Sequence, residues 1–394
     1  MKEGWTYKKL GEVCEVTDYV ANGSFATLKE NVTYYNEPNY AILVRLADYS
    51  SNFDKSKFVY VDEHSYNFLS KSKLYGGEII MSNVGSVGKC FICPNLGQPM
   101  TIGPNSVLIR TPNSQYFYYY FQSESFQNKL RTITNKATLA KFNKTQFRDI
   151  EIYFPSNSEQ QRIVSRLDSA FAHIDELKAN AEKQLSEARA LFQKALTKAM
   201  EPKEGWEEKP LKQIAKYSIG LTYKPSDVSE KGTIVLRSSN IQEDKLDLND
   251  IVRVTCPIKE SLYVKKGDIL MCSRNGSARL VGKVTVIPET KEKMTYGTFM
   301  MVISSDYNPY LFYFFKSDDF RSQIKHGEAN MINQITRYML DDVTVSVPPF
   351  SEQQRIVSRL DSLSAHVREL EDVLQKTIVE CDVLKQALLR KVFE

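Results

Sequence analysis

Apolar residues recur at steps of three and four positions along two long stretches of the chain. The first stretch carries Ile163, Leu167, Ala170, Ile174, Leu177, Ala181, Leu185, Ala188, Leu191, Ala195 and Ala199. The second repeats the pattern 193 residues later with Ile356, Leu360, Leu363, Val367, Leu370, Leu374, Ile378, Cys381, Leu384, Leu388 and Val392. A heptad-like stripe sustained for about five heptads is typical of helices that pack on another helix. We therefore predict helices over 158–200 and 351–393 that pair antiparallel, and leave open that each packs only on its own domain.

Local signals mark where these helices begin and end. Ser158 with Gln161, and Ser351 with Gln354, match the capping-box pattern at the two starts. Pro202 ends the first helix, because proline lacks the amide hydrogen that a helix interior needs. At about 1.5 Å per residue, each helix is roughly 60 Å long.

The stretches before the helices alternate short apolar runs with Gly, Asn, Ser and Pro, a pattern that favours strands and turns. The predicted strands are 40–46, 77–82 and 105–110 in the first stretch, and 233–237, 268–272 and 298–304 in the second. Helices over 116–129 and 310–325 follow them. Each stretch is therefore expected to form a mixed α/β globule.

The chain contains one sequence unit twice. Residues 158–169 recur identically as 351–362, and shorter matches extend the repeat over most of the chain. We predict an α+β fold of two pseudo-symmetric mixed α/β domains separated by two long antiparallel coiled-coil helices. The predicted limits are 1–155 for the first domain, 156–200 for the first helix, 201–348 for the second domain and 349–394 for the second helix.

Composition narrows the class of protein. The 394 residues are 42% hydrophobic and 25% charged, which is typical of folded proteins of two to three domains. The chain has no apolar run of 18 residues and no apolar N-terminal segment, so we expect no membrane span and no secretion. Six cysteines in this length favour a reduced cytoplasmic setting. The net charge of +4 is modest, so any nucleic-acid binding must rest on local patches.

The sequence has no recognisable catalytic or metal-binding constellation. Gly85–Lys89 has the wrong spacing for a phosphate-binding loop, and Val347–Phe350 lacks the amine-accepting side chain of the similar methyltransferase tetrad. Cys90 and Cys93 form an isolated pair, and the four histidines lack metal-ligand spacing. We predict no catalytic residue, no metal site and no cofactor in this chain.

Three groups of polar residues are candidates for contacts with DNA. Residues 127–148 carry six positive charges and no acid, enough to neutralise several phosphates. The candidates there are Lys136, Thr138, Lys141, Asn143 and Lys144. Two glycine-containing loops add Asn83, Ser86 and Lys89, and Arg274, Asn275, Ser277 and Arg279. Two matching strand ends add Arg45, Arg237 and Asn240. The alternatives are a solvated face, plain hairpin turns and structural ion pairs, respectively.

Several motifs occur in the same order in both copies. A proline exit leads into Ser-Glu-Gln-Gln-Arg-Ile-Val at 155–168 and 348–361, and a Gly-[Glu/Asp]-Ile-[Ile/Leu]-Met-[Ser/Cys] strand precedes a Gly-Lys element. With these motifs and the 142–150 segment, nearly the whole chain resembles the specificity (S) subunits of type I restriction–modification systems. Residues 332–337 depart from the 142–150 form, and Asn333 and Arg337 are the candidate contacts there.

The resemblance implies a function for each part of the chain. Residues 5–155 and 206–348 are then target recognition domains, each reading one half of a bipartite double-stranded DNA site. The helices set the gap and dock two modification subunits, which are adenine-N6 methyltransferases; a restriction/translocase subunit is a further partner. S-adenosylmethionine, ATP and Mg²⁺ belong to those partners, so this chain is not an enzyme. The interface candidates on the helices are Ile163, Leu167, Ile174, Leu177, Ile356, Leu360, Val367 and Leu370.

Two alternative functions stay open at this point. One is a specificity subunit of a fused, type II-like restriction system, which differs in its partner chains. The other, of a different class, is a coiled-coil scaffold that binds only protein. A steep salt dependence of DNA binding separates the last from the first two, because phosphate contacts release counterions.

Overall fold

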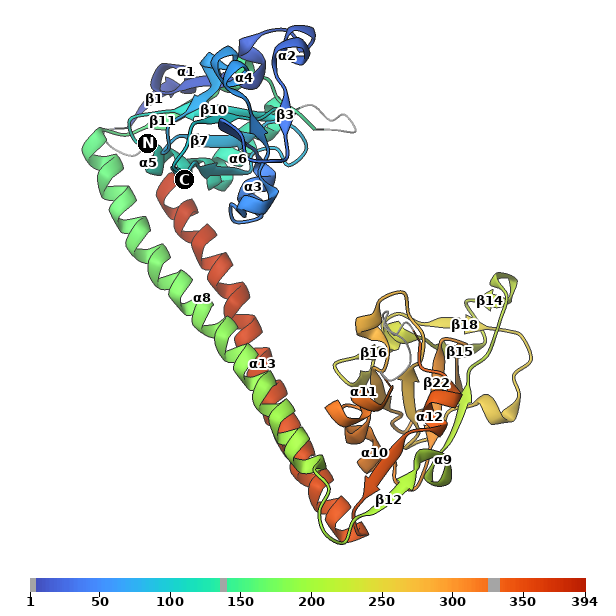
Figure 1. Ribbon diagram of the computed structural model, residues 1–394. Helices are drawn as coiled ribbons and strands as arrows, with labels where there is room; N and C mark the ends of the chain where they lie inside the picture. The colour runs from blue at the N-terminus through green and yellow to red at the C-terminus, as the bar shows by residue number, and fades with distance from the viewer. Residues whose placement is uncertain (1–4, 135–139, 325–333) are drawn as a thin grey trace. The chain divides into compact units, whose positions relative to one another are not determined.

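The computed structural model describes residues 5–134, 140–324 and 334–394 (Figure 1). The chain divides into two compact units, of which unit 1 comprises residues up to 181 with 376–394 and unit 2 comprises 182–375. Each unit contains one α/β globule and a part of both long helices. None of the described helices is long and apolar enough to cross a membrane.

An antiparallel four-stranded sheet and a mixed five-stranded sheet form the globule of unit 1. The first has the order β2 (Glu15–Asp18), β10 (Ser106–Arg110), β7 (Ile79–Ser82) and β8 (Cys90–Ile92). The second has the order β3 (Tyr34–Tyr35), β5 (Tyr60–Val61), β4 (Ala41–Val44), β9 (Met100–Ile102) and β6 (Lys73–Leu74). β1 (Thr6–Lys9) pairs antiparallel with β11 (Glu151–Phe154), which leads into the first long helix.

Unit 2 repeats the first sheet of unit 1, whereas its second sheet has four strands instead of five. One sheet has the order β13 (Lys216–Ile219), β22 (Met300–Ser304), β19 (Ile269–Cys272) and β20 (Val284–Val286). The other has the order β14 (Val228–Ser229), β18 (Val252–Val254), β15 (Thr233–Leu236) and β21 (Met294–Tyr296). Two-stranded pairs join β12 (Glu207–Pro210) to β23 (Thr344–Val347) and β16 (Ile241–Gln242) to β17 (Lys245–Leu246). Ile79 lies opposite Ile109 and Ile269 opposite Ile303, so the central strands share one register. Every predicted strand is present.

Each globule packs two short helices where the sequence predicted one. They are α5 (Ser114–Gln122) and α6 (Glu124–Ile133) in unit 1, and α10 (Asn308–Phe314) and α11 (Asp318–Ile324) in unit 2. The prediction of single helices over 116–129 and 310–325 is therefore wrong. In unit 1 the break lies at Ser123, whose hydroxyl accepts the Phe126 N–H at 3.3 Å and begins the second helix. Ser317 does the same with the Phe320 N–H at 3.2 Å in unit 2.

Short helices connect the remaining strands. They are α1 (Leu10–Val13), α2 (Phe25–Asn31), α3 (Leu46–Ser50), α4 (Glu63–Phe68), α7 (Lys144–Arg148), α9 (Leu211–Ile214) and α12 (Arg337–Asp341). The equivalent helices α7 and α12 each precede the strand that enters a long helix. They begin at Asn143 and Thr336, whose side chains accept a backbone N–H three residues on.

The long helices are α8 (Asn157–Met200) and α13 (Phe350–Phe393), each of 44 residues (Figure 1). The predicted capping boxes are wrong, because Ser158 and Ser351 already lie within the first turn. The Ser156 hydroxyl instead accepts the Glu159 N–H at 3.3 Å. Both helices thus begin slightly earlier than the capping pattern indicates.

A buried glutamine anchors each helix start to the strand before it. Gln160 donates its side-chain amide to the Pro155 carbonyl at 3.1 Å, and Gln353 donates to the Pro348 carbonyl at 2.8 Å. Both side chains are buried. Because the same contact recurs in both units, the identical sequence motif sets the direction in which each helix leaves its globule.

The helices pack antiparallel within each unit. Ile163 and Leu167 of α8 share the unit 1 core with Leu389 and Phe393 of α13. Leu196 and Met200 of α8 share the unit 2 core with Ile356 and Leu360 of α13. Ion pairs join Asp175 to Lys385 and Lys178 to Asp382 in unit 1, and Arg189 to Glu371 in unit 2. The predicted antiparallel pairing is confirmed within each unit.

The partner helix covers only part of the predicted stripe. Of the interface candidates, Ile163, Leu167, Ile174, Ile356 and Leu360 are buried and Val367 is half-buried. Leu177 is 57% exposed and Leu370 is 43% exposed, so the partner helix leaves these two positions largely uncovered. On a straight helix, residues seven apart are displaced by about 20° around the helix axis. Part of the heptad stripe therefore turns away from the partner helix.

Candidate functional site

In unit 1, two candidate segments that are distant in sequence lie side by side. The loop after β7 pairs with the segment before α7 through a bridge between Val84 and Lys141. The Gly85 N–H donates to the Ala140 carbonyl at 2.9 Å, and the Phe142 N–H donates to the Asn83 carbonyl at 3.2 Å. The strand–loop element and the basic segment therefore form one continuous surface, which we call face 1 (residues 83–89 and 140–148).

Unit 2 has the equivalent surface, which we call face 2 (residues 273–283 and 334–341). Here Arg274 bridges Gln334, and the Ile335 N–H donates to the Ser273 carbonyl at 2.7 Å. This pairing aligns Ile335, Thr336 and Arg337 with Phe142, Asn143 and Lys144. The sequence at 332–337 therefore differs little from its counterpart in unit 1, because an apolar residue, a helix-capping residue and a basic residue follow one another in both.

The faces carry exposed cations and small polar side chains. On face 1, Ser86, Lys89, Lys141 and Asn143 are exposed. On face 2, Arg274, Ser277, Arg279 and Arg337 are exposed. Asn275 donates its side-chain amide to Ser238 Oγ at 3.2 Å and accepts the Ser277 N–H at 2.9 Å, so it shapes the loop tip. Exposed cations near hydrogen-bonding groups are the combination that phosphates and base edges require.

Some candidates on these faces have contacts inside the fold. Lys144 Nζ lies 2.8 Å from Asp18, a buried carboxylate, so its charge is largely neutralised. Lys89 Nζ lies 3.4 Å from Ser50 Oγ. Asn83 Oδ1 is buried without a hydrogen-bond partner among the described residues. Lys136, Thr138 and Asn333 lie outside the described residues.

The candidate residues at the strand ends make contacts that stabilise the turns in which they lie. Arg45 pairs with the buried Asp48 at 2.6 Å, and Arg237 pairs with Asp250 at 2.8 Å. Asn240 is 0% exposed, and its side-chain amide donates to the Asp247 and Asp250 carbonyls at 2.8 Å each. These contacts match the structural alternative, in which the three residues shape the loops beside the faces.

Two exposed aromatic side chains on unit 2 escaped the sequence analysis. Phe299 is 55% exposed at the turn before β22, and Tyr338 is 82% exposed on α12 beside Arg337. Aromatic residues in apolar runs are expected in the core, so sequence pattern gave no signal for either. The backbone of Phe299 accepts the Ser273 N–H at 3.0 Å, which places it at the edge of face 2.

The cysteine pair of unit 1 lies inside the globule. Cys90 and Cys93 are buried and free, and burial raises the pKa of each thiol to about 12. Metal binding requires thiolates, which such a site disfavours. No cluster of three or more His, Cys, Asp or Glu suited to a metal occurs among residues 5–134, 140–324 and 334–394.

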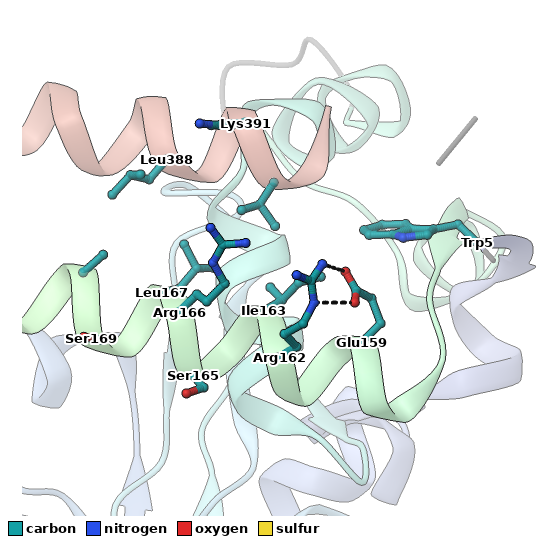
Figure 2. A pocket seen from close by; sticks show the side chains of 12 residues that line it. Trp5, Glu159, Arg162, Ile163, Ser165, Arg166, Leu167, Ser169, Leu388 and Lys391 are labelled. Atoms are coloured by element: carbon teal, nitrogen blue, oxygen red, sulfur yellow. Dashed lines mark hydrogen bonds and ion pairs between the residues drawn. The ribbon is translucent and has the colours of Figure 1, made fainter. Parts of the chain in front are cut away.

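A groove of about 640 Å³ lies in unit 1 between the first turns of α8 and the last turns of α13 (Figure 2). Its floor is apolar and its sides carry Arg162, Arg166 and Lys391. Figure 2 shows Glu159 joined to Arg162 by two contacts, each 2.7 Å, at the end of the groove near Trp5. The α8 residues of this groove belong to the twelve-residue motif that recurs identically at the start of α13.

The tyrosines of the globule helices tie each globule to its long helix. Tyr119 donates its hydroxyl to Asp168 in unit 1, and Tyr313 donates to Asp361 in unit 2. Burial and these carboxylates raise the pKa of both phenols. The tyrosines thus remain protonated donors at neutral pH, and the same tie holds both faces to their helices.

The sequence matches the family model described as "Type I restriction modification DNA specificity domain" twice, over residues 2–187 and 203–379. The EcoKI specificity subunit of Escherichia coli K12 is 24% identical over 422 residues, covering 100% of this chain and 89% of the relative. The MjaX specificity subunit of Methanocaldococcus jannaschii, which carries that assignment provisionally, is 24% identical over 391 residues, covering 92% and 87%.

Solved structures share the fold over the whole chain. A chain from a study of complex assembly and conformational transition of the type I R-M system has a TM-score of 0.77 at 18% identity, covering 100% of this chain and 98% of that one. The HsdS subunit from Thermoanaerobacter tengcongensis has a TM-score of 0.55 at 19% identity, covering 100% and 97%.

Proposed function

Because the chain belongs to the type I restriction modification DNA specificity domain family, whose model it matches twice, we propose that it is the DNA-recognition subunit of a type I restriction–modification complex. One observation carries the proposal: the same loop-and-segment surface occurs in both units with different side chains. Two surfaces of one architecture and different chemistry suit a DNA site of two unrelated halves. Face 1 reads one half and face 2 the other.

The charges of the faces support contact with a nucleic acid. On face 2, Arg279 and Arg337 are exposed, and the described residues offer neither of them an ion pair. Cations free of internal partners keep their full charge for phosphates, whose counterions they displace. Hydrogen-bonding groups such as Ser277 lie next to them in sequence and can meet base edges.

The helices support docking of two copies of one partner. The motif at the start of α8 recurs unchanged at the start of α13, and identical surfaces bind identical partners. Exposed leucines on both helices, such as Leu177 and Leu370, provide apolar area that the helix pair itself does not cover. We assign this partner as the modification methyltransferase, with a restriction/translocase subunit as a further component. The chain itself is non-catalytic, and S-adenosylmethionine, ATP and Mg²⁺ are bound by those subunits.

A domain exchange tests the division between the two faces. Residues 206–348 are replaced by the matching globule of another specificity subunit, the chain is co-expressed with its methyltransferase, and methylated sites are mapped by sequencing. We expect one half-site to change and the other to persist. The reciprocal exchange of residues 5–155 is the matched control and must change the opposite half. Alteration of both halves by a single exchange would refute the modular assignment.

Salt dependence tests DNA contact itself. The complex should lose affinity as salt rises, with a slope of log K against log salt of about −0.9 per phosphate contacted. Arg279→Ala and Arg337→Ala should each reduce this slope by about one. Lys266→Ala is the control, because Lys266 is exposed but paired with Glu289 at 2.8 Å. Binding insensitive to salt and to both arginine variants would favour a scaffold that binds only protein.

A further inference from the structure

Unit 2 differs from unit 1 at two pairs of equivalent positions, one on the faces and one at their edges. The Asn83 N–H donates to the Asn105 carbonyl in unit 1, as the Ser273 N–H donates to the Phe299 carbonyl in unit 2. Phe299 therefore occupies the place of Asn105. The bridges described above likewise equate Arg274 with Val84. Where unit 1 has an aliphatic and an amide side chain, unit 2 has a cation and an aromatic ring.

The two side chains of unit 2 form a cation–π pair. The guanidinium carbon of Arg274 lies 5.4 Å from the centre of the Phe299 ring, within the range of a cation–π contact. The Arg274 N–H also donates to the Phe299 carbonyl at 3.1 Å, so backbone and side chain hold the two residues together. No carboxylate among the described residues pairs with Arg274, and its side chain is exposed.

This arrangement leaves the hydrogen-bonding edge of the guanidinium available. A cation–π contact with a ring uses none of the hydrogen bonds that the guanidinium N–H groups can donate to a carbonyl or ring nitrogen. Those donors keep the fork geometry that matches O6 and N7 of guanine in the major groove. Contact with the Phe299 ring also restricts the rotamers of the long Arg274 side chain before DNA binds, so less side-chain entropy is lost when a base is contacted.

We propose that Arg274 reads a guanine in the half-site bound by residues 206–348, and that Phe299 is the positioning residue that orients its guanidinium. This inference rests on the proposed function. The equivalent Val84 and Asn105 cannot form such a pair, so the guanine contact is specific to the second half-site. Phe299 acts through Arg274 and touches no base itself.

The test uses the full complex of the chain with its methyltransferase on DNA whose half-site bases are randomised. Arg274→Ala should lower the preference for guanine at one position by roughly 5- to 150-fold. Arg274→Lys should not restore it, because an ammonium has no fork. Phe299→Leu should lower the same preference by about 2- to 5-fold. Phe299→Tyr and Phe299→Trp should keep it, since each retains a ring.

The first half-site in the same experiment is the internal reference and should not change. Tyr263→Leu is the matched control, because the Tyr263 ring lies 5.0 Å from Lys293 Nζ in the same unit and neither residue belongs to face 2. The inference is overturned if Phe299→Leu leaves the guanine preference intact, or if the ring-retaining variants lose it as fully as Phe299→Leu. Absence of any bipartite methylation by the unaltered complex would instead refute the proposed function.

Discussion

The cross-helix ion pairs allow a direct measurement of how charge holds α8 and α13 together. In unit 1, Lys178 Nζ lies 2.8 Å from Asp382, with side-chain exposures of 28% and 62%. An ion pair of this exposure contributes about 0.2–1 kcal/mol in measured cases. Lys178→Glu removes that attraction and adds a like-charge repulsion of similar size. We therefore expect the free energy of unfolding to fall by about 1 kcal/mol.

The measurement is urea unfolding followed by helical circular dichroism at low salt, arranged as a double-mutant cycle. Asp382→Lys alone should destabilise similarly, and the double reversal should restore most of the loss, because it rebuilds the pair with its signs exchanged. In about 1 M salt the differences should shrink, since the screening length falls to about 3 Å. Lys183→Glu controls for a change of charge on α8, as Lys183 pairs with Glu187 of the same helix, at 3.8 Å. A double reversal no more stable than either single variant would refute the reasoning.

Three further predictions concern thiols, the tyrosine ties and the spacer. In the native protein at pH 8, Cys256 should react first with a thiol reagent, whereas Cys90 and Cys93 should react only after unfolding, because burial raises the pKa of each thiol to about 12. Rapid labelling of Cys90 and Cys93 in the native protein would contradict their burial. Tyr313→Phe should lower the free energy of unfolding by about 1 kcal/mol through loss of its hydrogen bond to Asp361, and an unchanged urea midpoint would count against that tie. Deleting one heptad from both long helices shortens each by about 10 Å, so methylation mapping should find half-sites about three base pairs closer; an unchanged gap would remove the spacer role.

The sequence was most informative where one element can be read from local periodicity. The long helices, their antiparallel pairing and the central strands follow from patterns within a few heptads or a few residues. Burial of individual stripe positions does not, because it depends on how two helices drift against each other. Leu177 is the example: it fits the heptad stripe and is nevertheless exposed.

Side-chain caps, the partners of side chains in turns, and contacts between distant segments were not predicted from the sequence. The break at Ser123 divides a helix that apolar pattern alone made continuous. For Arg45 and Arg237 the sequence left base contacts and structural ion pairs open, and the folded turns supply a carboxylate partner for each. Conversely, Phe299 lies within a predicted strand, and only the folded structure shows its side chain exposed at the edge of face 2. The basic segment and the loop were each found from sequence, but their adjacency was not.

The charges of the residues in the cross-helix ion pairs also bear on how the two copies of the repeat have diverged. By the 193-residue repeat, Lys178 corresponds to Glu371 and Arg189 to Asp382, so α8 is basic and α13 acidic at both positions. A half-length chain with only the first copy, pairing antiparallel with itself, would set Lys178 against Arg189 twice. A dimer of the second copy would set Glu371 against Asp382. These two pairs therefore favour pairing of the first copy with the second over pairing of either copy with itself, so the charges of the repeat have diverged in a way that suits one chain carrying both copies.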